Sequence, residues 1–174
     1  MLAVEQNLLD IVDALISIKK FNLNEKVNGI CAIDIAWRRG DASEDLTIKQ
    51  RSFDIILNLL KANSIYPLYF NVERASEPIQ QFVTTSNRLH ELIKTHDILL
   101  SDNSVQITEI IDQNMNLRHF YNLDNESAAF VTLKLWKFDL YDLLGSKNKT
   151  MAPTDPADQI STILQQLNKN NKLK

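Results

Sequence analysis

The stretch from Ile30 to Trp37 reads Ile-Cys-Ala-Ile-Asp-Ile-Ala-Trp, and it decides how the rest of the chain is interpreted. Every position in it except Asp34 carries an apolar side chain. A β-strand that is covered on both faces has this nearly continuous apolar character. We therefore predict a central strand over residues 30–37, directly after the turn signal Asn28-Gly29.

Three segments around this strand have the periodicity of amphipathic helices. In the segment 46–63, apolar side chains recur at three- and four-residue intervals. Asp45 or Ser43 can cap the free N–H groups at its start. The segments 3–20 and 77–94 repeat the same spacing, so the sequence predicts a helix in each of the three.

Together these patterns predict a single α/β or α+β domain. Its mixed sheet has about four to six strands with the helices packed on it, and the strands at 30–37 and 66–72 are parallel neighbours. The further strands are expected at 98–100, 105–111 and 117–123. Residues 128–144 fit both a strand and a helix, and we favour a strand early with a helical turn near residues 140–144.

A linker and a last helix are expected beyond this domain. The predicted organisation is a globular domain over 1–145, a linker over 146–155, and an amphipathic helix with a frayed tail over 156–174. The apolar stripe of the last helix consists of Ile160, Ile163, Leu164 and Leu167. Because helix-in-groove recognition uses this i, i+3, i+4, i+7 spacing, we predict that the stripe binds a partner or a second copy, and the alternative is that it packs onto the parent domain.

Composition excludes several classes of protein. The 174 residues carry 19 Lys and Arg against 22 Asp and Glu, a net charge of −3 that disfavours nucleic-acid binding as the main task. The three glycines, Gly29, Gly40 and Gly145, are too far apart to build a glycine-rich phosphate loop. The single cysteine, Cys31, excludes an intramolecular disulfide and is expected to be a small buried apolar residue. No signal peptide and no long apolar run is visible, so we expect a cytoplasmic chain without membrane contact.

Acidic residues around the predicted strand suggest one possible catalytic site. They are Asp34, Asp41, Glu44, Asp45 and Glu73. Carboxylates at strand ends hold Mg²⁺ in metal-dependent nucleases. In such a site of this chain, the catalytic residues would be Asp34, Asp41 and Glu73, and the metal ligands would be Asp34, Asp41 and Glu44. The spacing matches no defined motif. We favour the simpler interpretation, in which Asp34 faces outward or pairs with Arg38 or Arg39 and the others are cap and loop residues.

Histidine and lysine residues give weaker signals. His90, His96 and His119 lack the spacing of a zinc helix, and His96 near a helix end favours a capping role. Lys134 and Lys137 flank Trp136, an arrangement that can sit beside a nucleic-acid base but that usually belongs to a solvated face.

These signals favour a non-enzymatic intracellular protein-binding module. An adaptor, a chaperone, or an inhibitor or immunity protein that masks its partner would all fit, with no cofactor. The expected partner is another protein or a second copy of the chain. The alternative is a small Mg²⁺-dependent nuclease or phosphodiesterase that uses the strand-end carboxylates.

Overall fold

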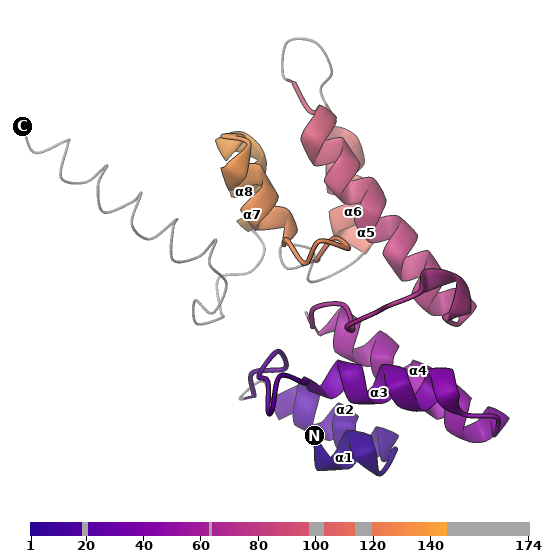
Figure 1. Ribbon diagram of the computed structural model, residues 1–174. Helices are drawn as coiled ribbons and strands as arrows, with labels where there is room; N and C mark the ends of the chain where they lie inside the picture. Colours follow the sequence, from indigo (N-terminus) through magenta and orange to yellow (C-terminus); the bar gives the residue numbers. More distant parts are fainter. Residues whose placement is uncertain (19–20, 63, 98–102, 114–119, 146–174) are drawn as a thin grey trace, which may run out of the picture. The chain divides into compact units, whose positions relative to one another are not determined.

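The computed structural model describes residues 1–18, 21–62, 64–97, 103–113 and 120–145. These residues form helices joined by irregular segments, and no β-strand occurs among them (Figure 1). The chain divides into two compact units. Unit 1 comprises Met1–Arg88 together with Phe120–Asn125, and unit 2 comprises Leu89–His119 and Glu126–Lys174.

The predicted α/β or α+β fold with a mixed sheet is therefore wrong, and its central strand shows why. Residues 32–37 begin the helix α3, Ala32–Ala42. The buried side of α3 consists of Ile33, Ala36, Trp37 and Gly40, at the i, i+3, i+4, i+7 positions of a helix. Gly40 carries no apolar side chain, so the apolar pattern in the sequence stops at Trp37 and resembles that of a short strand covered on both faces.

Cys31 starts this helix in a way that the sequence concealed. Its Sγ and its backbone N–H both donate to the carboxylate Oδ2 of Asp34, at 2.9 Å and 2.8 Å. The backbone N–H of Asp34 in turn donates to the Cys31 side chain, so the two residues form a capping box, with Cys31 at the N-cap and Asp34 at the third helical position. Ser and Thr are the usual N-cap residues of such boxes, so a cysteine here gave no helix signal.

The other predicted strands are helical or irregular where the structure describes them. Residues 66–71 form an irregular loop that leads into a 3₁₀ turn, η1, Val72–Arg74. Residues 105–111 belong to α6, Ser104–Gln113, in which Ile107 and Ile110 are buried one helical turn apart. Residues 98–100 and 117–119 lie outside the described residues, and residues 120–123 form no strand.

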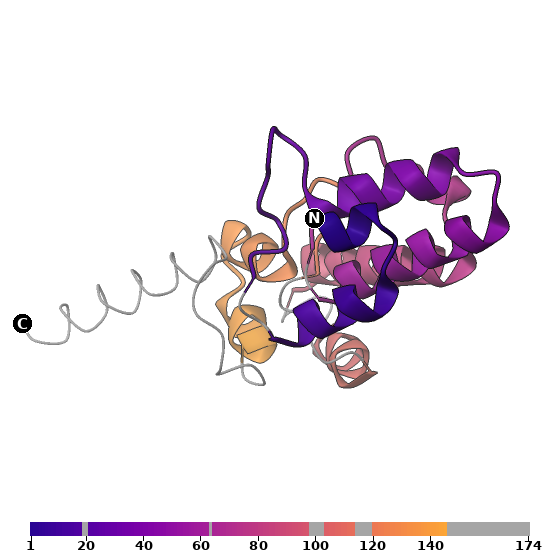
Figure 2. The ribbon, with the colours of Figure 1, turned by 90° about the horizontal axis from the view of Figure 1, so that it is seen from below.

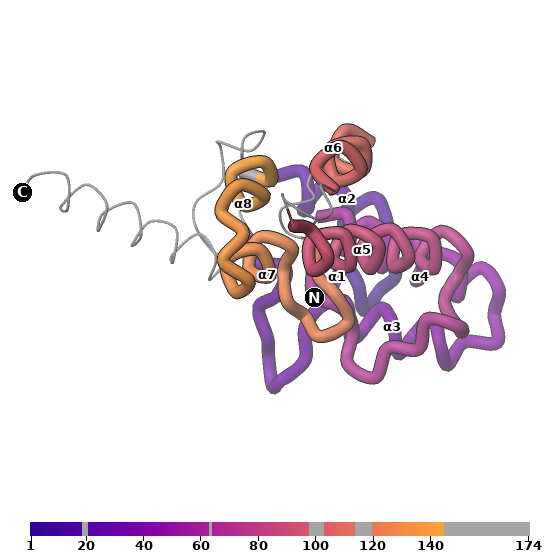
Figure 3. Tube along the Cα trace, turned by 90° about the horizontal axis from the view of Figure 1, so that it is seen from above, coloured from indigo at the N-terminus to yellow at the C-terminus, as the bar shows by residue number. Residues whose placement is uncertain are grey.

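Residues 128–144 are helical at both ends. They form α7, Ala128–Lys134, and α8, Phe138–Gly145, which follow each other through a short turn (Figure 3). The expected helical turn near residues 140–144 is confirmed. The early strand is wrong, because Ala128, Ala129, Val131, Thr132 and Leu133 are all buried together in one short helix.

The long amphipathic helices are confirmed. α4 spans Leu46–Lys61 and α5 spans Glu77–Thr95. Asp45 caps α4, with its carboxylate accepting from the N–H groups of Thr47 and Ile48. The predicted helix at 3–20 is interrupted: α1 covers Leu2–Glu5 and α2 covers Leu9–Ile18, and buried Asn7 between them has a left-handed φ of 57°.

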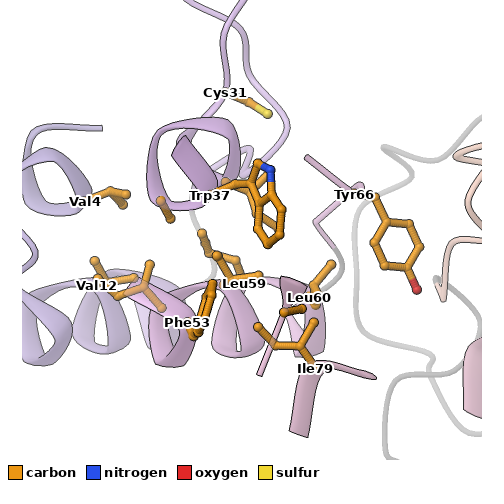
Figure 4. Close-up of a cluster of buried hydrophobic side chains, with 14 of the residues drawn as sticks. Val4, Val12, Cys31, Trp37, Phe53, Leu59, Leu60, Tyr66 and Ile79 are labelled. Carbon is orange, nitrogen blue, oxygen red and sulfur yellow. The ribbon is translucent and has the colours of Figure 1, made fainter. Parts of the chain in front are cut away.

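The core of unit 1 lies between α3 and α4. α1 packs on α3 and on α2, and α2 packs on α4 (Figure 2). Trp37 of α3 points toward Leu59 and Leu60 of α4, and its ring stacks on Phe53 with centroids 6.1 Å apart (Figure 4). Gly40 permits this close approach, because a Cβ at that position would lie 3.1 Å from atoms of Phe53 and Ser52.

Unit 1 is completed by a segment that returns late in the chain. Phe120 packs on Phe82 of α5, with ring centroids 4.7 Å apart. The Oγ of Ser86 donates to the carbonyl oxygen of Tyr121 at 2.7 Å, and the side chain of Asn125 accepts from the N–H of Tyr66 at 2.9 Å. Residues 120–125 therefore pack against α5 and against the loop at Tyr66, both of which lie much earlier in the sequence.

Unit 2 combines the last turns of α5 with α6, α7 and α8. α8 contacts both α7 and α6, and a small buried cluster of Ala129, Leu133 and Tyr141 joins α7 to α8. His90 of α5 contacts the carbonyl oxygen of Glu126, with 3.2 Å between Nε2 and O.

Candidate interaction site

Asp34 is the most buried of the predicted acidic site residues, and its carboxylate holds the backbone together. Its Oδ1 accepts from the N–H of Leu68 at 2.6 Å, while its Oδ2 accepts twice from Cys31. Burial by itself raises the pKa of Asp34. The hydrogen bonds from Cys31 and Leu68 and the nearby charge of Arg38 outweigh it and hold the pKa below the ordinary value of 3.8. Both carboxylate oxygens are thus occupied by the chain itself.

The other acidic residues do not gather around Asp34. Asp41 lies on the last turn of α3 and pairs with Arg74, with 2.9 Å between Oδ1 and Nε. Glu44 is exposed in the connection before α4, and Glu73 is exposed in η1. Within the described ranges, no three His, Cys, Asp or Glu side chains are placed to share a metal ion. Arg39, a predicted partner of Asp34, instead donates to the carbonyl oxygen of Glu5.

His96 and Asp139 form the contact that most resembles a catalytic dyad. His96 is buried just after α5, with its Nε2 2.9 Å from Oδ2 of Asp139. The backbone N–H of Asn103 lies 3.2 Å from Nδ1 and can only donate. Nδ1 must therefore accept, and the proton on Nε2 faces Asp139. Because both ring nitrogens have structural partners, His96 has no free nitrogen to act as a base toward a substrate.

The two lysines beside Trp136 are both engaged. Nζ of Lys137 donates to the carbonyl oxygens of Ile93, Lys94 and His96, at 2.7, 2.7 and 2.6 Å. Nζ of Lys134 lies 2.7 Å from the carboxylate of Glu126. The ammonium group of Lys137 thus binds the end of α5, and that of Lys134 binds Glu126. The two lysines therefore do not form the cationic pair that nucleic-acid contact would use.

A hollow opens beside the first turns of α4 and carries no catalytic pair. Lys49 lies over the ring of Phe53, 5.9 Å from its centroid. The lining residues are Leu46, Thr47, Lys49, Gln50, Arg51, Phe53 and Ser76. None of them is a carboxylate or a histidine, so the hollow has no carboxylate–histidine pair of the kind that acid–base catalysis commonly uses.

The turn between α7 and α8 has an unusual residue at its centre. The N–H of Lys137 bonds the carbonyl of Thr132 at 2.9 Å, and the N–H of Trp136 bonds the carbonyl of Leu133 at 3.1 Å. This pair of bonds defines a Schellman motif, in which the residue at the position of Trp136 takes a left-handed conformation and is usually glycine. Trp136 has φ 59° and is 77% exposed.

We call residues 135–138 the aromatic turn. Trp136 and Phe138 contact each other edge to face, with ring centroids 5.9 Å apart. Leu135 and Phe138 are also exposed, so three apolar side chains face solvent in four residues. Lys137, the fourth residue, fastens the turn to the carbonyl end of α5. The turn is therefore a firmly held apolar projection of unit 2.

Unit 1 has one comparable position. Among the described non-glycine residues, those with a positive φ are Asn7, Asn28, Tyr69, Asn125 and Trp136. Asparagine tolerates this conformation, whereas a bulky aromatic residue in it is uncommon. Tyr69, with φ 59°, is 92% exposed. This conformation indicates a binding role at Trp136, because the exposed ring of Phe138 lies against the indole, and Tyr69 serves as the position for comparison.

Sequence reasoning did not single out the aromatic turn as a binding site. No residue in it is Gly, Asn or Pro, so nothing marked a chain reversal or a left-handed position. The predicted partner-binding residues Ile160, Ile163, Leu164 and Leu167 lie outside the described residues. His119 lies outside them as well.

Comparison of the chain with protein-family models, with curated proteins and with solved structures finds no match. In the part of the chain that the structure describes, no helix has both the length and the apolar character needed to cross a membrane.

Proposed function

We propose that this chain is a non-enzymatic protein-binding module, of the adaptor, chaperone or inhibitor and immunity type, and that its protein partner receives the aromatic turn in an apolar pocket. The observation that supports this most directly is Trp136, an exposed tryptophan at a position where glycine would cost less. Tryptophan is the residue most enriched among binding hot spots.

The construction of the turn favours a preformed anchor. A side chain that is already held in place loses little conformational freedom on binding, and this improves affinity. The Schellman hydrogen bonds fix the backbone at Trp136, and Lys137 fixes the turn on α5. The edge-to-face contact with Phe138 further restricts the indole ring. The partner surface that fits this projection is a pocket lined by apolar side chains.

A cytoplasmic location is part of the same proposal. It is supported by Cys31, the single thiol of the chain, which is buried and free. A chain that relies on a reduced cysteine in its core suits a reducing compartment.

The proposal is tested by capture and then by reconstitution. Wild-type chain, Trp136→Ala and Tyr69→Ala are used as baits in extracts of the source cells, and retained proteins are identified and purified. The matched control is Tyr69, an exposed aromatic in the same backbone conformation on unit 1. We expect the purified partner to bind wild-type chain and Tyr69→Ala alike, and to bind Trp136→Ala about 30-fold more weakly, as expected for a hot spot of about 2 kcal/mol.

Fluorescence locates the contact independently. The chain has two tryptophans, and Trp37 is buried in unit 1. We expect the partner to shift Trp136 emission to shorter wavelength and to protect it from acrylamide. Equal binding by Trp136→Ala and wild type would contradict the proposal. Calorimetric Mg²⁺ binding that Asp34→Ala abolishes would favour the nuclease alternative instead.

A further inference from the structure

The helix α2 has apolar side chains on two neighbouring faces, and the core covers only one of them. On the inner face, Val12 is buried and Leu9 and Ile16 pack against the unit 1 core. The side chain of Asn58 on α4 donates to Asp13 at 2.7 Å and fixes this orientation. The inner face alone accounts for the attachment of α2 to unit 1.

The second face carries a regular stripe of larger aliphatic side chains, which we call the outer stripe. It consists of Ile11, Leu15 and Ile18 of α2 and of Leu8, which directly precedes the helix. Leu8, Ile11 and Ile18 are 44%, 48% and 51% exposed, and Leu15 is partly exposed. Their spacing of three, four and three residues is the a/d pattern of a helix that pairs with another helix. Core packing inside unit 1 does not require this stripe.

We propose that the outer stripe binds the outer stripe of a second copy of this chain, with the two α2 helices antiparallel. The spacing is the same when it is read in either direction. The two-fold axis crosses the outer stripe midway along it, at the level of residue 13. Leu8 of one copy then meets Ile18 of the other, and Ile11 meets Leu15. A surface that matches itself in this way forms the closed, isologous interface of a symmetric dimer.

Charge favours the antiparallel direction. Asp10 lies in the first turn of α2, and the sequence continues with Lys19-Lys20 after Ile18, the last residue of the helix. In the antiparallel pair, the acidic end of one copy approaches the basic end of the other, and the two helix dipoles oppose each other. A parallel pair would bring like charges together.

The size of the surface sets the expected affinity. Two ten-residue helices bury less than the ~1,200 Å² typical of specific stable interfaces. We therefore expect a weak dimer that forms at micromolar to millimolar concentration. The outer stripe belongs to unit 1 and the aromatic turn to unit 2, and this proposal rests on no contact of the aromatic turn, so it does not depend on the proposed function.

Charge substitutions in the stripe test both the occupant and its direction. The weight-average mass of purified full-length chain is measured by sedimentation equilibrium over a range of concentrations. We expect wild-type chain to approach twice its monomer mass, and Ile11→Glu and Leu15→Lys each to remain monomeric. An equimolar mixture of the two variants should dimerise again, because the new carboxylate at position 11 then faces the new ammonium at position 15 while the second Ile-Leu contact is retained.

Two control variants accompany this measurement. Leu46→Glu changes an exposed leucine at the start of α4, 79% exposed, and Trp136→Ala changes the aromatic turn. Both should dimerise like wild type. Circular dichroism checks that each stripe variant is folded, as expected for exposed positions. A wild-type chain that stays monomeric at every concentration would overturn the proposal, as would persistent dimers of Ile11→Glu or a mixture that stays monomeric.

Discussion

The carboxylate of Asp34 accepts a hydrogen bond from the backbone N–H of Leu68, with 2.6 Å between Oδ1 and N. This contact joins the first turn of α3 to a loop that has no regular secondary structure of its own. A single buried side chain thus starts one helix and positions a distant loop, and its removal should affect the whole of unit 1.

We predict that Asp34→Ala lowers the free energy of unfolding by about 3 kcal/mol, because two buried donors and one partly buried donor lose their acceptor. Urea unfolding followed by circular dichroism measures this loss. Asp41→Ala is the control, since it breaks only the exposed ion pair with Arg74 and should cost about 1 kcal/mol or less. Equal effects of the two substitutions would show that the hydrogen bonds of Asp34 stabilise unit 1 no more than an exposed ion pair does.

Acid should remove the contribution that the Asp34 carboxylate makes to the free energy of unfolding. The pKa of Asp34 is held below its ordinary value of 3.8 in the folded chain, so its contribution is fully present above that value. It is lost as the pH falls from there through the folded-state pKa. We expect the stability difference between wild type and Asp34→Asn to be large at about pH 6 and to shrink as the pH falls below 3.8. A difference that does not change with pH would contradict this assignment.

Cys31 should make the chain sensitive to alkali. Burial, with the Asp34 carboxylate nearby, raises the pKa of the Cys31 thiol from 9.0 to about 11. The neutral thiol is therefore favoured in the folded state. Its contribution is complete below pH 9.0 and is lost as the pH rises toward about 11. A thiol reagent at about pH 8 should react with Cys31 only as fast as the chain opens. Immediate reaction of the native protein would exclude this buried, protonated state.

Lys137 should matter more for stability than its neighbour Lys134. Burial lowers the pKa of Lys137, and the negative charges of Asp97 and Asp139 offset this shift only in part. Lys137→Met leaves three carbonyl oxygens at the end of α5 without their ammonium donor, and we expect a loss of about 2 kcal/mol in thermal unfolding. Lys134→Met breaks an exposed pair and should cost less than about 1 kcal/mol.

Trp136→Gly should separate binding from stability. Glycine adopts the left-handed conformation without steric cost, so we expect the free energy of unfolding to stay level or to rise by about 1 kcal/mol. The same variant should lose the partner. Chemical unfolding measures the first effect, and titration with the purified partner measures the second. A variant that unfolds more easily would show that Trp136 serves packing, which would remove its role as an anchor.

Long, strongly periodic helices were predictable from the sequence, whereas most short elements were not. α4 and α5 run for four or more turns, so their apolar spacing is unambiguous. The apolar pattern of α3 is cut short by Gly40, and its N-cap is a cysteine. Residues 128–144 make two short helices around a reversal that no glycine marks. A strand covered on both faces and a short buried helix have the same apolar composition, and only three-dimensional packing separates them.

The candidate site was less predictable than the fold. The sequence drew attention to Asp34, but the structure gives that side chain backbone partners in Cys31 and Leu68 that no spacing rule indicates. Trp136 was noted only for its two flanking lysines. Its importance comes from its φ angle and its exposure, and both follow from how α7 ends.

Residues 120–125, which complete unit 1, have a consequence for how the protein is made. During translation, α1 to α4 and the start of α5 leave the ribosome well before Phe120, Tyr121 and Asn125 are synthesised. Unit 1 therefore cannot be completed until residues 89–119 have been synthesised. Until then, Phe82 lacks its contact with Phe120, and the N–H of Tyr66 lacks its acceptor on Asn125. A nascent or truncated chain that stops at Arg88 is an unfinished unit whose exposed aromatic surface invites aggregation.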